Sequence, residues 1–243
     1  MRSFTGFLAV LMALALPHIC LGQAVTPSTP SSGPAGTQTT PPAPLGPDYY
    51  FNSIAAAQQA IWQLPPPPAV GSPGQATNVQ TLNTVIADAS PQAVANANAT
   101  ANYTVFDFAT VLGPSFNAQN LPILNDFFNK VTINTVDASQ DVKAFFNSPG
   151  PQTPATYPST QTMMGLDEGV LLGLMVPEMQ SQLQSFGIQE GLNRLIVDAH
   201  WPTDVSGGYM LSDILMQDMS ASPQFQSDFN AAKTELRSVL GLK

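Results

Sequence analysis

The sequence predicts an all-α fold formed by a single helical domain, and three observations carry that prediction. Apolar residues recur at helical spacing from Ser72 onward, two Ser-Pro pairs mark helix starts, and strand patterns are weak. Residues 131–136 are rich in β-branched side chains, which suit either a strand or the end of a helix. The candidate domain covers residues 48–243, about 195 residues, an ordinary size for one domain.

Residues 1–22 have the pattern of an export signal. Arg2 supplies a positive start, residues 7–16 form an apolar core, and a small-residue segment ends before Gln23. Cys20 offers a lipoprotein alternative, but the residues ahead of it lack the small side chain expected before a lipidated cysteine. The apolar core is too short to cross a bilayer, and no other apolar run is long enough. We therefore expect an exported protein, periplasmic or secreted, without a membrane span.

Residues 23–47 form a tether in this interpretation. They contain seven prolines among Thr, Ser, Gly and Ala, with no charged and no aromatic residue. Such a segment cannot bury enough apolar surface to offset the entropy lost on ordering. Within the domain, residues 65–68 are four consecutive prolines, which predict an extended strap between two helices.

Helix starts and apolar stripes define the later elements. Ser90 precedes Pro91 and Ser222 precedes Pro223, which pairs a capping hydroxyl with a proline that suits the first helical position. After the second pair, apolar residues recur on one helical face at Phe225, Phe229, Ala232, Leu236 and Leu240. A similar pattern precedes it at Leu211, Ile214, Leu215 and Met219. Both patterns predict amphipathic helices.

The composition excludes several functions. Only 9% of residues are charged, and loss of Arg2 with the leader leaves 16 acidic residues against six basic ones. Nucleic-acid binding depends on Lys and Arg, so we expect no nucleic-acid partner. The domain has no cysteine and one histidine, His200, which excludes disulfides, thiolate sites and multi-histidine metal sites. We therefore expect neither a metal nor a cofactor.

The only strongly patterned polar group surrounds this histidine. Arg194 precedes His200 by six positions, and Asp204 follows it by four, with Pro202 between them. Pro202 predicts a helix start, where backbone N–H groups favour an anion, and Asp204 can orient the imidazole. Arg194 offers a planar donor pair suited to phosphate. The pattern predicts a histidine nucleophile beside a phosphate site.

These residues resemble a known three-part signature. The motif Asn193-Arg194-x5-His200-x3-Asp204 follows Tyr157-Pro158-Ser159 and Lys143-x6-Gly150-Pro151. It is similar to that of the type 2 phosphatidic acid phosphatase superfamily, especially the bacterial class A non-specific acid phosphatases. The resemblance implies an all-helical fold of the acid phosphatase and vanadium haloperoxidase type.

Roles follow from the resemblance position by position. It implies that His200 forms a phosphohistidine and that Asp204 orients it. It also implies that Lys143, Ser159 and Arg194 bind phosphate.

Two positions depart from the family pattern. Gly150 stands where the first motif has a phosphate-binding Arg, and Gln161 stands where the second has the His that serves as general acid. An amide cannot transfer a proton as that His would. Asp167, Glu168 and Asp198 are the candidate substitute acids, since a raised pKa lets a carboxyl donate a proton.

The resulting hypothesis is a metal-independent phosphomonoesterase of reduced activity, with a phosphomonoester or free phosphate as its ligand. The alternative is a catalytically inactive module that binds phosphate or another oxyanion, or that acts through its surface. A vanadate-dependent peroxidase has a similar site but normally keeps the second histidine that Gln161 replaces.

Overall fold

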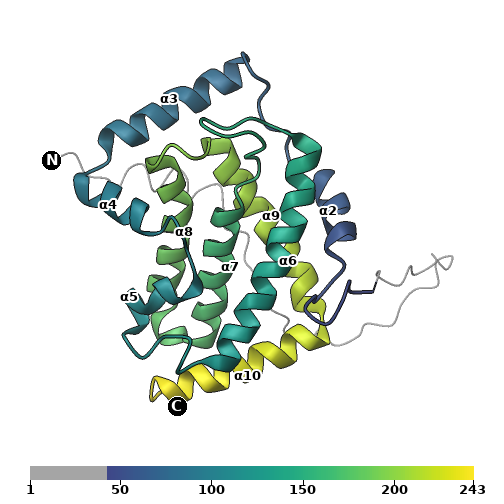
Figure 1. Cartoon of the computed structure of the whole chain (residues 1–243), viewed down its shortest axis with the longest axis vertical. Coiled ribbons are helices and arrows are strands. Elements are labelled where there is room, and N and C mark those ends of the chain that lie inside the picture. The colour runs from purple at the N-terminus through teal and green to yellow at the C-terminus, as the bar shows by residue number, and fades with distance from the viewer. Residues whose placement is uncertain (1–42) are drawn as a thin grey trace, which may run out of the picture. The chain divides into compact units, whose positions relative to one another are not determined.

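The computed structural model describes residues 43–243, and within that part of the chain it contains helices and no strand (Figure 1). The all-α prediction is therefore confirmed. The predicted leader, residues 1–22, and most of the predicted tether, residues 23–47, lie outside the described residues. No helix within residues 43–243 is both long enough and apolar enough to cross a membrane.

The α-helices are α2 (Ser53–Ile61), α3 (Pro73–Asp88), α4 (Pro91–Ala99), α5 (Ala109–Leu112), α6 (Pro122–Phe146), α7 (Thr160–Met175), α8 (Gln180–Ile196), α9 (Pro202–Ala221) and α10 (Pro223–Val239). Two 3₁₀ turns, Val105–Phe108 and Pro177–Met179, precede α5 and α8.

Proline at the first turn starts five of these helices, namely α3, α4, α6, α9 and α10. Proline suits this position because it lacks an N–H that would have no partner there. The hydroxyls of Ser90 and Ser222 accept from the backbone amides of Ala93 and Phe225, which confirms both predicted starts. These caps fix where α4 and α10 begin.

Residues 131–136 lie inside α6 rather than in a strand or at a helix end. The helix buries Phe127, Val131 and Ala138 along one face, so tertiary packing outweighs the local β-branched preference. The four-proline strap runs between α2 and α3, as predicted. The carbonyl of Pro65 accepts a bond from the Tyr157 hydroxyl at 2.5 Å, which ties the strap to the segment before α7.

Helices α7 and α8 pack closely because glycine lines their contact. A Cβ at Gly187 of α8 would lie 2.1 Å from the carbonyl oxygen of Gly165 on α7, so no side chain fits there. The short connection between the two helices makes them antiparallel, and Figure 1 shows them side by side. The start of α7 and the end of α8 therefore lie at the same end of the domain.

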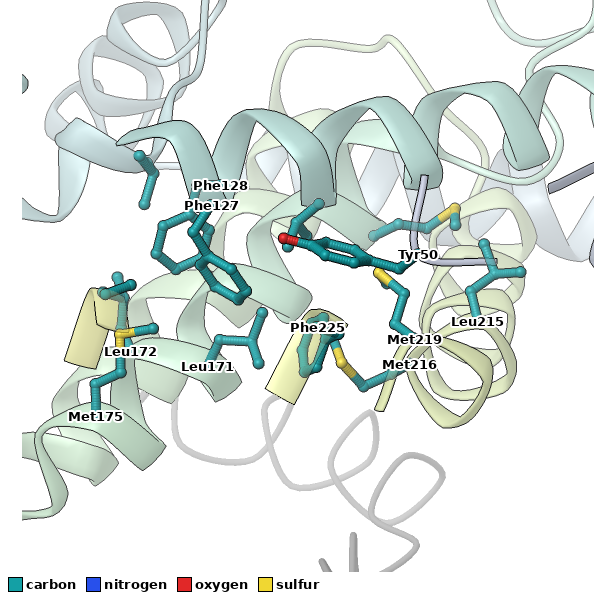
Figure 2. Packing of buried hydrophobic residues seen from close by; sticks show 14 of the residues in the cluster. Tyr50, Phe127, Phe128, Leu171, Leu172, Met175, Leu215, Met216, Met219 and Phe225 are labelled. Atoms are coloured by element: carbon teal, nitrogen blue, oxygen red, sulfur yellow. The ribbon is translucent and has the colours of Figure 1, made fainter. Parts of the chain in front are cut away.

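The core joins α6, α7, α9 and α10 (Figure 2). Phe127 of α6 packs against Tyr50 and Phe225, with ring centroids 6.3 and 5.4 Å apart. The predicted α10 stripe is confirmed: three of its members are buried and two are packed at the margin of the core. Methionines of α7 and α9, among them Met175 and Met219, fill the remaining space. This core packs together α6, α7 and α9, three of the helices whose ends carry the candidate site.

Candidate active site

The predicted site residues lie at the end of α6 and α8 and at the start of α7 and α9. Lys143 is in the last turn of α6, and Ser159 caps the start of α7. Arg194 is in the last turn of α8, and His200 and Asp204 flank the start of α9. Four separate helix ends therefore supply the five polar side chains.

His200 and Asp204 form the pair that the sequence predicts. The His200 Nδ1 lies 3.4 Å from Asp204 Oδ2, which also accepts from the Trp201 amide at 3.0 Å. The second contact caps α9 and fixes the carboxylate. Because Asp204 accepts at Nδ1, the neutral ring carries its proton there, and Nε2 keeps a free lone pair.

Ser159 is held against α9 by its backbone. Its amide donates to the carbonyl of Asp204 at 2.9 Å, and its side chain is fully buried. The Ser159 hydroxyl accepts a bond from the Thr162 hydroxyl at 2.8 Å, which leaves its own proton available to donate.

Lys143 points at the segment that leads into α7. Its Nζ donates to the carbonyls of Thr156, at 2.8 Å, and of Pro158. Burial lowers the pKa of Lys143 to about 8, with the Asp204 carboxylate acting in the opposite direction. Two of the three ammonium protons are used by these carbonyls, so one remains for an anion.

The charges of the site act on His200. Burial lowers the pKa of its imidazole, and the positive charges of Lys143 and Arg194 lower it further, while Asp204 raises it. The ring is therefore held neutral to a lower pH than usual, and a neutral imidazole is the form that can attack phosphorus.

The Thr156 side chain occupies the space that a side chain at Gly150 would need. A Cβ built at Gly150 would lie 2.3 Å from the Thr156 methyl and 2.9 Å from the Thr156 Cβ. The buried Thr156 hydroxyl has no hydrogen-bond partner within residues 43–243. Thr156 therefore excludes a larger residue at 150 unless this segment moves.

Arg194 and Gln161 both donate to the end of α4. Arg194 Nη2 lies 3.1 Å from the Ala97 carbonyl and 3.5 Å from the Thr100 hydroxyl. Gln161 Nε2 donates to the Thr100 carbonyl at 2.8 Å. Asn193 donates to the Thr100 hydroxyl at 3.3 Å. The end of α4, which is distant in sequence, therefore occupies the Arg194 donor that we expected to bind phosphate and the Gln161 donor that we expected near the leaving group.

Three bacterial phosphatases are similar to this chain over most of its length. The acid phosphatase of Zymomonas mobilis is 24% identical and covers 89% of this chain and 84% of its own. The non-specific acid phosphatase of Providencia stuartii is 24% identical over 90% of this chain and 96% of its own. That of Salmonella typhimurium is 24% identical over 76% and 83%. No protein-family model matches the chain.

The chain is a distant homologue of the bacterial non-specific acid phosphatases. Its fold is the all-helical fold of acid phosphatases in the type 2 phosphatidic acid phosphatase superfamily.

Two of the three substitute acids considered for this phosphatase homologue, Asp167 and Asp198, have other hydrogen-bond partners, and the third, Glu168, is buried. Asp167 accepts from Thr135 at 3.0 Å and from Ser212 at 2.5 Å and is fully buried. Asp198 accepts from Gln152 at 3.1 Å. Glu168 is buried, and burial raises its pKa to about 8. Within residues 43–243, no hydrogen bond or ion pair joins any of the three to His200.

Sequence reasoning missed three residues around the site of this homologue, namely Ala97, Thr100 and Thr156. Thr100 is 94 positions from Arg194, and Ala97 makes its contact through its backbone. Thr156 acts by filling the space beside Gly150. None of these roles has a local sequence signal, because each depends on which segments meet in the fold.

Proposed function

We propose that the protein is a phosphomonoesterase that works through a phosphohistidine at His200. The observation that carries the proposal is the His200 imidazole, bonded through Nδ1 to Asp204 and close enough to Lys143 and Arg194 for both charges to lower its pKa. The homology to acid phosphatases supports the same chemistry.

The proposed reaction has two steps. His200 Nε2 attacks phosphorus and forms an N–P bond while the bond to the leaving oxygen breaks. Lys143, Ser159 and Arg194 bind the phosphoryl oxygens and balance their charge, and no metal takes part. Water then attacks the phosphohistidine, releases phosphate and regenerates the neutral ring.

The leaving oxygen receives its proton from water in this proposal, because Gln161 cannot supply one. Loss of a general acid costs a factor of about 10² to 10⁴ when the leaving group is a poor one. An aryl oxide leaves without protonation, whereas an alkoxide does not. Aryl phosphates should therefore be much better substrates than alkyl phosphates.

The test compares an aryl and an alkyl phosphate at millimolar concentration with the purified protein. We expect measurable aryl-phosphate hydrolysis, alkyl-phosphate hydrolysis slower by at least about 10²-fold, and an acid-labile phosphoryl group on His200 after rapid quenching. His200→Ala should abolish all three signals, and His200→Gln serves as a variant of similar size. Absence of turnover on both substrates would reject the proposal.

A phosphate-binding protein without turnover is the second candidate. The contacts of Arg194 and Gln161 with α4 favour it, since they withdraw donors from any bound phosphate. It predicts that vanadate or phosphate binds and that neither substrate is hydrolysed. Hydrolysis that disappears in His200→Ala excludes this candidate.

Export is part of the proposal. The pattern of residues 1–22 supports it through the positive start, the apolar core and the small-residue exit. Cleavage before Gln23 would release a domain that acts outside the cytoplasm.

A further inference from the structure

Helix α4 is weakly attached to the rest of the domain. Of its nine residues only Ala97 is buried, and the helix is composed of small and polar residues apart from Val94. It lies against α8 (Figure 1). A helix of this length is marginal alone in water, so α4 depends on its contacts for stability. Moving it away from α8 exposes little apolar surface of α4 itself.

Side chains of the candidate site make most of the polar contacts with the end of α4. The Ala97 and Thr100 carbonyls belong to its last turn, where a helix has acceptors without internal partners and a partial negative charge. Arg194 and Gln161 donate to these two carbonyls, and α4 has no basic residue of its own in that turn. The two site residues therefore act as the helix cap of α4.

Arg194 is not fully satisfied by these contacts. Its side chain is buried, yet its Nε has no hydrogen-bond partner within residues 43–243. Burial also lowers the pKa of its guanidinium, and the nearby Glu190 carboxylate acts in the opposite direction without a hydrogen bond to it within residues 43–243. Neutral carbonyl and hydroxyl acceptors bind a guanidinium less strongly than an oxyanion does. The free Nε donor and the neutral acceptors leave this guanidinium able to bind an oxyanion.

We propose that the end of α4, residues 97–100, is an internal lid that occupies the Arg194 and Gln161 donors until a phosphate or phosphomonoester displaces it. The inference rests on the proposed function, since both concern the same anion site. An anion that takes the Arg194 Nη2 and Gln161 donors must break their contacts with α4, so its measured affinity is the intrinsic affinity reduced by the fraction of molecules with the lid open.

An opposite role for α4 predicts an opposite result. If the Thr100 hydroxyl instead held Arg194 in the correct position for phosphate, its removal would weaken anion binding. If it holds the lid closed, its removal strengthens anion binding. Thr100→Val removes the hydroxyl that accepts from Asn193 and Arg194 while keeping the shape of the side chain. Thr100→Ser keeps the hydroxyl and is the matched control.

The experiment measures vanadate and phosphate binding to the full chain by calorimetry. We expect Thr100→Val to lower the Kd for vanadate about three- to tenfold, the range that loss of one or two hydrogen bonds from the closed state predicts, and Thr100→Ser to leave it unchanged. An unchanged or raised Kd in Thr100→Val overturns the lid. If neither anion binds to any variant, the proposed function fails together with the lid.

Hydrogen exchange supplies a measurement that needs no variant. Saturating phosphate should reduce the protection of amides in residues 91–104, because the lid is displaced, while protection of the α7–α8 contact is kept. Increased protection of residues 91–104 on phosphate binding overturns the lid, even where Thr100→Val fails to fold.

Discussion

The two sides of the candidate site differ in how their polar groups are used. On the nucleophile side, the Asp204 carboxylate bonds to the His200 ring, and the Asp204 carbonyl accepts from the Ser159 amide. His200 keeps a free lone pair at Nε2, and Ser159 keeps a hydroxyl proton that it can donate. On the α4 side, Arg194 and Gln161 donate to a helix from another part of the chain. The second side is also where the sequence departs from the family signature at Gln161. At the position where the general acid is lost, the Gln161 amide therefore donates to the Thr100 carbonyl of the α4 end.

The largest effect should come from restoring the missing general acid on the α4 side. Gln161→His supplies a general acid, and we expect alkyl-phosphate hydrolysis to rise by about 10² to 10⁴-fold where the rest of the site is intact. Aryl-phosphate hydrolysis should rise much less. Steady-state rates with both substrates measure the difference. Equal gains on the two substrates would contradict a role for residue 161 in leaving-group protonation.

Restoring the arginine at position 150 needs a second change. Because a Cβ at Gly150 lies only 2.9 Å from the Thr156 Cβ, Gly150→Arg alone should disturb the segment whose carbonyl holds Lys143. Gly150→Arg combined with Thr156→Gly removes the overlap. We expect the pair to exceed Gly150→Arg alone in kcat/KM by about tenfold or more, the size of one charge-assisted phosphate contact. The Thr156→Gly single variant is the control.

The pH dependence of stability tests two buried acids of α7, Asp167 and Glu168. Burial raises the pKa of Asp167 to about 7 and that of Glu168 to about 8. The folded state then holds protons that the unfolded chain releases above its own pKa near 4, so the free energy of unfolding should fall as pH rises from about 4 to 8. Denaturant unfolding across this range measures the slope.

The matched variants are Asp167→Asn and Glu168→Gln, which cannot titrate and should flatten that slope. Two groups act in the opposite direction, because burial lowers the pKa of both His200 and Lys143. Their contribution to the free energy of unfolding grows as pH rises. For the imidazole it grows up to its ordinary pKa of 6.5, and for the lysine between about 8 and 10.5. A slope that is unchanged in both acid variants would show that the acids ionise freely in the folded protein.

The smallest effect compares two helix caps of the same kind. Ser90 caps α4 and Ser222 caps α10, each through its hydroxyl. Either Ser→Ala change removes a cap of about 1 kcal/mol. Ser222→Ala should lower the free energy of unfolding by that amount and leave anion affinity unchanged. Ser90→Ala should instead loosen α4 locally and tighten vanadate binding about twofold to threefold. Equal effects of the two variants on binding would argue against a separable α4.

The parts of this protein that the sequence alone predicted depend on local interactions. Helical spacing, Ser-Pro helix starts and the apolar stripe of α10 act within one or two turns, so the all-α fold could be inferred from them. The His200 and Asp204 pair is also local, because four positions across a helix start bring the two side chains together. Lys143 and Ser159 were found only by resemblance to a family signature.

Tertiary structure alone decided the rest. The helical state of residues 131–136 depends on a face of α6 that is buried by other helices. Thr156 beside Gly150, the burial of Asp167 and the contact of Thr100 with Arg194 join segments far apart in the chain or depend on how a loop folds back. Side-chain type and spacing do not predict these long-range contacts, because they arise from the packing of whole helices. The sequence therefore indicated which chemistry the site could perform, and the fold determined which of its donors are already in use.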